Sequence, residues 1–263
     1  MAYYFPPQQK PQRWGNFQSV QYAIRKNSEK IFGVDPDSNV LNIPGFWGLP
    51  ALDYSKYNNH GTSYQWDRGI VNNNTGRLEV SHSPVLGASG LSYSVLILHD
   101  GITLDTWGGI YCKRTNAAGD DAQYSLQRYL SSGYVNVYHG SISSVSLLSV
   151  TTSLLANAGY LGIVFDRSGI DAYNDGKLIE RASFGTAVPA GDGSLLLGRE
   201  RTDIATYSAD YICKIFSVYN SILTAEQIAL FYARKWDLYR RVGRTYYSIA
   251  AAPSIYIPQI MIF

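Results

Sequence analysis

The sequence predicts an all-β fold, either a sandwich or a barrel, and three observations lead to that prediction. Short apolar runs such as "SYSVLILHD" and "GYLGIVFD" recur at intervals of roughly ten residues, with Gly, Asn, Asp and Ser between them. In several runs the side chains alternate strictly between the two faces that a strand would have, as they do in half-buried strands. Only one segment, near the end of the chain, has a clear helical pattern.

The first segment, residues 1–42, is predicted to be an extension of the sandwich. It begins with "MAYYFPPQQKPQ", a Pro/Gln-rich arm that offers few local contacts and gains order only against another surface. The following "SVQYAIRKNSEKIFG" is compatible with a short helix or with an irregular turn. The sandwich domain is expected to occupy residues 43–242.

Two patterns in the middle of the chain specify local structure. In "YVNVYHG", Tyr134, Asn136 and Tyr138 are expected on one face of a strand, with the two valines and His139 on the other. In "DAYNDGKLIE", the Asp-Gly pair lies between two apolar segments. Asp-Gly is favoured where a tight turn needs positive φ, so this stretch predicts a β-hairpin.

The segment "LTAEQIALFYARKW" predicts the one short helix of the domain. Thr224 is a good N-cap, and Gln227 three positions later completes a capping box. Leu223 and Ile228 form a hydrophobic staple, and Ile228 begins an apolar stripe that continues three and four positions later. The helix should therefore lie on a sheet edge or close one end of the sandwich.

The last segment, residues 243–263, is predicted to be an apolar C-terminal tail. It ends in "IYIPQIMIF", which in water would be an aggregation hazard. We expect the tail to be covered by its own domain or by a neighbouring chain.

Composition and charge narrow the function classes. The chain has 263 residues, 46% hydrophobic and 16% charged, with 22 tyrosines and a formal net charge of +2. This charge does not favour nucleic-acid binding, which needs a clustered basic face. No stretch approaches the roughly 18 apolar residues of a membrane span, and the N-terminus lacks the pattern of a secretory signal.

Two smaller features have structural interpretations. Cys112 and Cys213 form no CxxC or metal-ligand pattern, and we expect buried free thiols unless their strands are neighbours. The one local basic run is interpreted as a solvated or subunit-contact surface. Its members are Arg234, Lys235, Arg240, Arg241 and Arg244.

Five segments in order resemble the concanavalin A-like lectin/glucanase superfamily, and in particular its laminin G-like (LamG, pentraxin-like) branch. They are "DYSKYNNHGT", "GGIYCKR", "LGIVFDRSGIDAYNDGKLIE", "GSLLLGRE" and "ICKIFSVYNSILTAEQIALFY". The resemblance covers about residues 45–240, and "YNDGK" departs by one residue from the usual Asn-Gly pair. It implies a two-sheet jelly-roll sandwich of concanavalin A-like type, with one short C-terminal helix.

The ending "YARKWDLYRRVGRTYYSIAAAP" also resembles LamG-type proteins encoded by tailed bacteriophages. This resemblance implies a virion protein that is made in the host cytoplasm and released by lysis. Its partners would be other virion proteins and copies of itself, joined through the arm and the tail.

The turn-rich stretch "DYSKYNNHGT" has two readings. Asp53 and Ser55 can close Asx- and ST-type turns, and Gly61 can adopt a conformation closed to other residues. Asp, Asn and backbone oxygens are also ligands of calcium, although the spacing is not that of an EF-hand. We expect the structural role.

Binding residues are predicted by analogy with this family. Calcium is the only cofactor that the resemblance implies, and the candidate carboxylates are Asp120, Asp121, Asp166 and Asp171. A glycan such as a cell-surface polysaccharide would stack on exposed rings. The candidate rings are Trp66, Trp107, Tyr111, Tyr134 and Tyr138, with a core or interface role as the alternative for each.

Catalysis is not expected. Glucanases of this fold carry paired carboxylates on one strand, whereas Glu79 is followed by Val, Ser and His, and the adjacent Asp120 and Asp121 would point to opposite faces of a strand. The chain has no G-x-S-x-G or P-loop motif, and its four histidines are scattered. The sequence therefore favours a non-enzymatic phage virion structural protein that adheres to glycans. Examples are a capsid decoration protein and a head- or tail-associated protein. The alternative is a soluble lectin or carbohydrate-binding module.

Overall fold

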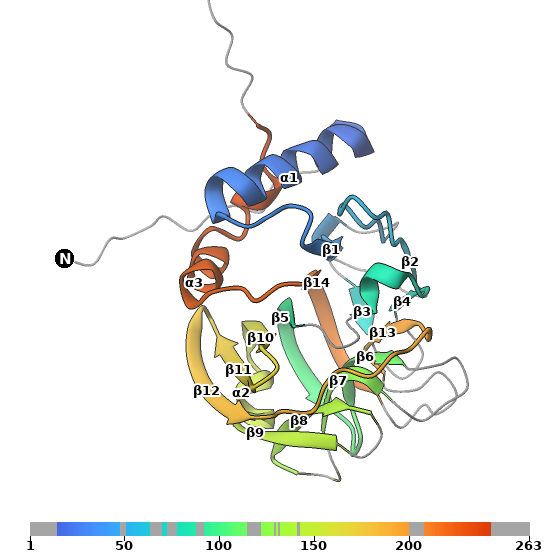
Figure 1. Ribbon diagram of the computed structural model, residues 1–263, viewed down its shortest axis with the longest axis vertical. Coiled ribbons are helices and arrows are strands. Elements are labelled where there is room, and N and C mark those ends of the chain that lie inside the picture. Colours follow the sequence, from blue (N-terminus) through green and yellow to red (C-terminus); the bar gives the residue numbers. More distant parts are fainter. Residues whose placement is uncertain are drawn as a thin grey trace, which may run out of the picture.

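A computed structural model describes residues 15–47, 51–63, 70–72, 78–87, 92–114, 122–128, 130, 132–140, 143–199 and 208–242. The described chain forms a two-sheet antiparallel sandwich of the jelly-roll type, as predicted (Figure 1). Sheet A has the order β1 (Asn39–Ile43), β14 (Ala209–Tyr219), β5 (Tyr93–Leu104), β10 (Ala158–Phe165), β11 (Gly169–Asn174) and β12 (Lys177–Ser183), with β3 (Ile70–Asn72) also paired to β14.

Sheet B has seven strands and packs its inner face against sheet A. Its order is β2 (Gly61–Ser63), β4 (Leu78–Val80), β13 (Leu195–Leu197), β6 (Gly109–Arg114), β7 (Ala122–Arg128), β8 (Tyr134–His139) and β9 (Ser143–Thr151). The inner faces of both sheets form the main core, which includes Ile97, Tyr111, Leu126, Val137 and Phe216.

The helices cover the outer face of sheet A. They are α1 (Phe17–Phe32) and α3 (Ala225–Arg234), with the 3-10 turns η1 (Gly45–Trp47) and η3 (Asp237–Tyr239) beside them. The short α2 (Thr152–Leu155) and η2 (Pro84–Leu86) connect strands. Figure 1 shows α1 and α3 together, away from β7, β8 and β9.

A second apolar cluster lies between these helices and sheet A. Alternation along β5 builds both cores, because Val95 and Ile97 point into the sandwich while Leu96 and Leu98 point to the helical layer. Phe32 of α1 stacks on Phe231 of α3, with ring centroids 4.3 Å apart.

The predicted helix and hairpin are confirmed. Thr224 and Gln227 form the capping box of α3, and both Ile228 and Phe231 are buried. Asp175 and Gly176 form the β11–β12 turn, both with positive φ.

The predicted domain boundary at residue 42 needs correction, because it falls inside β1, which pairs with β14. Residues 17–32 form a helix, which is one of the two alternatives expected for this segment. Asn16 caps it by accepting the backbone N–H of Ser19, and Gly33 ends it in the left-handed conformation. The arm before residue 15 and the tail after residue 242 lie outside the described residues.

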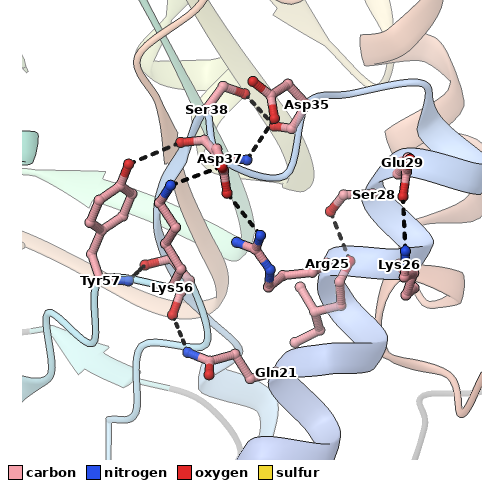
Figure 2. Close-up of polar contacts among 12 residues, drawn as sticks. Gln21, Arg25, Lys26, Ser28, Glu29, Asp35, Asp37, Ser38, Lys56 and Tyr57 are labelled. Atoms are coloured by element: carbon pink, nitrogen blue, oxygen red, sulfur yellow. Dashed lines mark hydrogen bonds and ion pairs between the residues drawn. The ribbon is translucent and has the colours of Figure 1, made fainter.

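Polar contacts attach α1 to the sandwich (Figure 2). The carboxylate of Asp37 lies 2.8 Å from Arg25 of α1 and 2.9 Å from Lys56. Gln21 of α1 donates to the backbone oxygen of Ser55. Helix and domain therefore form one unit.

The two cysteines are free and buried, as expected. Cys213 lies in the main core and Cys112 on the outer face of sheet B, beside Tyr138. No helix in the described part of the chain has the length and apolar character needed to span a bilayer.

Part of the basic run has a structural partner. The buried carboxylate of Asp237 accepts a hydrogen bond from Arg234 at 2.7 Å and forms an ion pair with Arg240 at 3.0 Å. The guanidinium groups of Arg234 and Arg240 remain about half exposed, so these two members of the run face solvent.

Candidate carbohydrate-binding face

The "DYSKYNNHGT" stretch is a turn organised by a single carboxylate. Asp53 is completely buried and accepts the backbone N–H groups of Asn42, Ser55 and Asn59 at 2.7–2.8 Å, together with the hydroxyl of Ser55 at 2.7 Å. Its own N–H donates to His60 Nδ1 at 3.1 Å. Burial raises the pKa of Asp53, and these hydrogen bonds oppose the rise. Both oxygens are occupied by donors, which supports the structural role.

Two of the predicted calcium ligands come together, but around a guanidinium group. Arg181 of β12 contacts Asp171 through Nε at 2.5 Å and through Nη2 at 2.9 Å, and it reaches Asp166 at 3.5 Å. Hydrogen bonds from Ser168, first from its hydroxyl, lower the pKa of Asp166. The arrangement is an Asx turn joined to a cross-strand ion pair.

The other two predicted calcium ligands, Asp120 and Asp121, lie outside the described residues. Within the described ranges, no cluster of three or more His, Cys, Asp or Glu side chains is placed to hold a metal ion.

The five candidate rings are divided by the fold. Trp66 lies outside the described residues, and Tyr111 is fully buried in the main core, where its ring meets those of Tyr124 and Phe216. Burial between the sheets removes Tyr111 from the candidate sugar contacts. Trp107, in the β5–β6 turn, and Tyr134, at the start of β8, are half-exposed.

Tyr134 belongs to one side-chain row on the outer face of sheet B. Because Val135 and Val137 point into the main core, Tyr134, Asn136 and Tyr138 point outward, as predicted. Tyr138 retains 8% exposure.

The neighbouring strand β7 continues this face. Tyr124 and Leu126 point into the core, which leaves Ser125 and Gln127 on the outside. Ser125 pairs across the strands with Tyr138, and Gln127 pairs with Asn136. We call the set of Ser125, Gln127, Tyr134, Asn136 and Tyr138 the outer β7–β8 face.

Trp107 lies close to one end of this face. The backbone N–H of Arg128, next to Gln127, donates to the carbonyl oxygen of Gly108 at 3.0 Å, and Gly109 is the cross-strand partner of Gln127. The turn that carries Trp107 is thereby held against the end of β7.

The outer β7–β8 face combines tyrosine rings with uncharged hydrogen-bonding groups. Ser125 is fully buried, while Gln127 and Asn136 keep 4% and 6% exposure. Asn136 Nδ2 donates to the hydroxyl of Tyr138 at 3.4 Å. Rings that present a face and amides that bond hydroxyls are the chemistry that suits a sugar.

Sequence reasoning did not select Ser125 or Gln127 as site residues. The signal was the alternation in "AQYSLQR", where Gln, Ser and Gln fall on every second position. Polar alternation is also what an ordinary solvated strand shows, so only the cross-strand partners in β8 distinguish this face.

The buried histidines have structural partners. His139 lies 3.0 Å from the hydroxyl of Tyr93 and 2.7 Å from the carbonyl oxygen of Thr186, so Nδ1 donates and Nε2 accepts. His99 Nδ1 accepts the N–H of Gly101 at 3.2 Å. Burial lowers the pKa of each to about 4. Both rings are therefore neutral core residues at pH 7.

One lysine is also buried, on the inner side of β6. Lys113 donates to the carbonyl oxygen of Gly193 and lies 3.3 Å from His82 Nδ1. Burial lowers the pKa of Lys113 to about 8. The ammonium group is thus held by a backbone carbonyl.

Comparison with solved structures shows the same fold. The chain superposes on a botulinum neurotoxin serotype D/C binding domain with a TM-score of 0.57 at 13% identity, covering 75% of this chain and 52% of that one. A second structure comes from work on botulinum neurotoxin type C, whose cell entry depends on interaction with two ganglioside molecules. Its TM-score is 0.53 at 14% identity, and the match covers 75% of this chain and 51% of that one. A botulinum neurotoxin DC binding domain in complex with rat synaptotagmin II gives 0.54 at 15% identity, covering 75% and 52%.

This chain spans about half the length of these structures, and at such identities the similarity establishes the fold alone. No protein-family model matches the chain, and no curated protein matches it in sequence.

Proposed function

We propose that the protein is a non-catalytic carbohydrate-binding protein that contacts its ligand through the outer β7–β8 face. The observation that carries the proposal is the side-by-side placement of Tyr134, Tyr138, Asn136 and Gln127 on adjacent strands. On sheet A, the described helices cover the outer side of β5, β10 and β14. The turn that carries the half-exposed Trp107 is held near the end of the same face.

The structural neighbours support a binding role of this kind. One is described by its interaction with two ganglioside molecules, and another was solved in complex with SialylT. The matched region is about half of each neighbour, so the ligands of these neighbours do not locate a site on this chain. They make a glycan the first ligand class to test.

The test is binding of the purified protein to an array of neutral and anionic glycans. We expect binding, and we expect Tyr134→Ala and Trp107→Ala to weaken it several-fold because a stacking surface is removed. Tyr22→Ala is the matched control, since Tyr22 is an exposed ring on α1, within the helical layer over sheet A. A protein that binds no glycan, or variants that bind as well as the wild type, would contradict this function.

We further propose that the protein works as a structural component of a tailed-phage virion, held there by its two terminal segments. The support is the resemblance of the chain's ending to phage LamG-type proteins, the Pro/Gln-rich residues 1–12 and the apolar residues 250–263. Terminal segments of such composition can pair with or wrap around neighbouring chains.

Light scattering on the full-length protein, with and without calcium, tests the virion proposal. We expect a stable oligomer, and we expect deletion of residues 1–12 or 250–263 to leave a folded sandwich that no longer assembles. A monomer unchanged by calcium, or a truncated protein that still assembles, would favour the soluble lectin instead.

A further inference from the structure

Two arginines of the basic run share one buried carboxylate at the surface of the helical layer. Arg234, the last residue of α3, donates its Nε–H to Asp237 Oδ2 at 2.7 Å, and the Nε of Arg240 lies 3.0 Å from Oδ1. Asp237 is 3% exposed, whereas the two arginine side chains are 43% and 55% exposed. The two guanidinium groups are therefore held beside each other in solvent, one on each oxygen.

The backbone that carries this pair is fixed by the rest of the domain. Asn27 of α1 donates to the carbonyl oxygens of Asp237 and Arg240, at 2.9 Å each. The hydroxyl of Tyr239, a fully buried residue, donates to Asn42 Oδ1 at 3.0 Å. A ligand that binds the pair would therefore order little of the chain, which keeps the entropic cost of binding low.

Both guanidinium groups keep donors available. A guanidinium group carries five N–H donors, and Asp237 engages each arginine through Nε. Among the described residues, no other acceptor contacts the terminal nitrogens of Arg234 or Arg240. These terminal N–H groups form the planar fork that makes paired hydrogen bonds to an oxyanion.

The charge around the pair is positive. The two guanidinium groups face the one carboxylate of Asp237, and Lys235 and Arg241 are their neighbours in the chain. Asp175 is a second nearby carboxylate, because it interacts electrostatically with Lys235. Four cations thus stand against two anions, and Arg244, the last member of the run, lies outside the described residues.

Another arginine of the chain shows the opposite arrangement. Arg181 contacts Asp171 through Nε and Nη2 and also reaches Asp166, so one cation faces two carboxylates and its fork is occupied. That site is complete without a ligand. The pair on Asp237 has the reverse ratio of charges and two open forks, which leaves a place for an anion from outside.

We propose that Arg234 and Arg240 form a clamp for one oxyanion, a carboxylate or sulfate group, of an acidic polysaccharide. The clamp lies on the helical layer, so it goes beyond the function proposed for the outer β7–β8 face. A nucleic acid fits less well, because it binds a basic stripe that follows its phosphates, and the net charge of this chain is only +2. Tyr232 and Trp236, the half-buried rings next in the chain, offer ring surface to a sugar.

The experiment is titration calorimetry of the full-length protein with polygalacturonate and dextran sulfate, at low and at physiological ionic strength. Dextran is the neutral counterpart, and duplex DNA and polyglutamate represent acidic polymers of other classes. Arg234→Gln and Arg240→Gln remove the charge and keep a side-chain donor. Arg181→Gln is the matched control, and thermal denaturation shows that each variant is folded.

We expect at least one of the two acidic polysaccharides to bind, and to bind less tightly at the higher ionic strength, because salt screens exposed charges. Each clamp substitution should weaken that binding about tenfold, since charge-assisted hydrogen bonds are lost. Arg240→Lys keeps the charge without the fork and should restore only part of the affinity. Arg181→Gln should bind as the wild type does, and dextran should not respond to the clamp substitutions.

Four outcomes would overturn the inference. They are no binding of either acidic polysaccharide, full binding by both clamp variants, an equal loss in Arg181→Gln, and tighter binding of DNA or polyglutamate than of the polysaccharides. The proposed function is tested separately by Tyr134→Ala. If that variant alone lost the acidic polysaccharides, the clamp would be wrong and the outer β7–β8 face would remain the binding surface.

Discussion

At the scale of single residues, one buried carboxylate organises the first turn of the domain. Asp53 satisfies backbone N–H groups from β1 and from the loop that follows it, so four donors converge on two oxygens. A hydrogen bond to a charged acceptor contributes about 1.5–3 kcal/mol, and leaving the buried donors unsatisfied adds further cost. The turn depends on this residue.

Replacing Asp53 by Ala should therefore lower the free energy of unfolding by about 3–5 kcal/mol. Chemical denaturation in urea at pH 7 measures the change. The control is Asp35→Ala, because Asp35 is exposed and accepts one local N–H from Asp37 at 2.9 Å. Its loss should cost under about 1 kcal/mol. Equal effects of the two substitutions would contradict the role given to Asp53.

Two buried histidines predict acid sensitivity. The pKa values of His99 and His139 in the folded protein are about 4, below the ordinary 6.5, because both rings are buried. The unfolded chain therefore binds more protons between these values, and stability falls as the pH drops from about 6.5 to about 4. Each ring accounts for at most about 3 kcal/mol of that loss.

Urea denaturation at several pH values between 7 and 4 checks this prediction. Asp100, Asp175 and Lys214 are the charged groups around His99, and the backbone oxygen of Thr186 faces His139. The double substitution His99→Gln and His139→Gln should flatten the pH profile in this window, whatever its effect at pH 7. An unchanged slope would show that other groups control the acid response.

At the scale of elements, the N-terminal helix is an integral part of the domain. Val20, Ile24 and Phe32 of α1 belong to the apolar cluster over sheet A. Asn27 Nδ2 lies 2.9–3.1 Å from the carbonyl oxygens of Asp237, Leu238 and Arg240, which ties α1 to η3. Its N-cap and C-cap are readable in the sequence, but its burial against η3 depends on contacts between residues some 210 positions apart.

Substituting Asn27 by Ala should lower the free energy of unfolding by about 1–3 kcal/mol, because the buried carbonyl oxygens of Asp237 and Leu238 lose their side-chain donor. Amide hydrogen exchange should rise most in α1 and η3, where the contacts are lost, and less in β6–β8. Lys30→Ala serves as the control on the exposed side of the same helix. An increase of exchange in β6–β8 as large as that in α1 and η3 would contradict the local role given to Asn27.

A strand or helix could be predicted where the residues that specify it are neighbours in the sequence, and could not where its position depends on distant contacts. The β11–β12 hairpin and α3 are specified by neighbouring residues, Asp175-Gly176 in one and Thr224 with Gln227 in the other. The face of β8 also follows from alternation. For Tyr111 the fold gives the alternative role, because its ring lies in the main core, and that depends on how the two sheets pack rather than on neighbouring residues.

At the scale of the whole molecule, the two apolar clusters lie on opposite faces of sheet A. Every strand that contributes side chains to both clusters should couple their unfolding. In β5, Ile97 is buried in the main core, and its neighbour Leu96 is buried in the cluster under the helices. A strand cannot lose one face and keep the other, because the same backbone hydrogen bonds hold both. The sandwich that carries the outer β7–β8 face should therefore unfold together with the helical layer.

We therefore expect a single cooperative unfolding transition. Leu96→Ala and Ile97→Ala should each lower the free energy of unfolding by about 2–5 kcal/mol, as truncation of fully buried aliphatic side chains does. Far-UV circular dichroism follows the sheets, and tryptophan fluorescence includes Trp47 and Trp236, which pack in the helical layer. The two probes should give the same midpoint in the wild type and in both variants. A fluorescence transition that precedes the dichroism transition, or that shifts only in Leu96→Ala, would mean that the helical layer unfolds on its own.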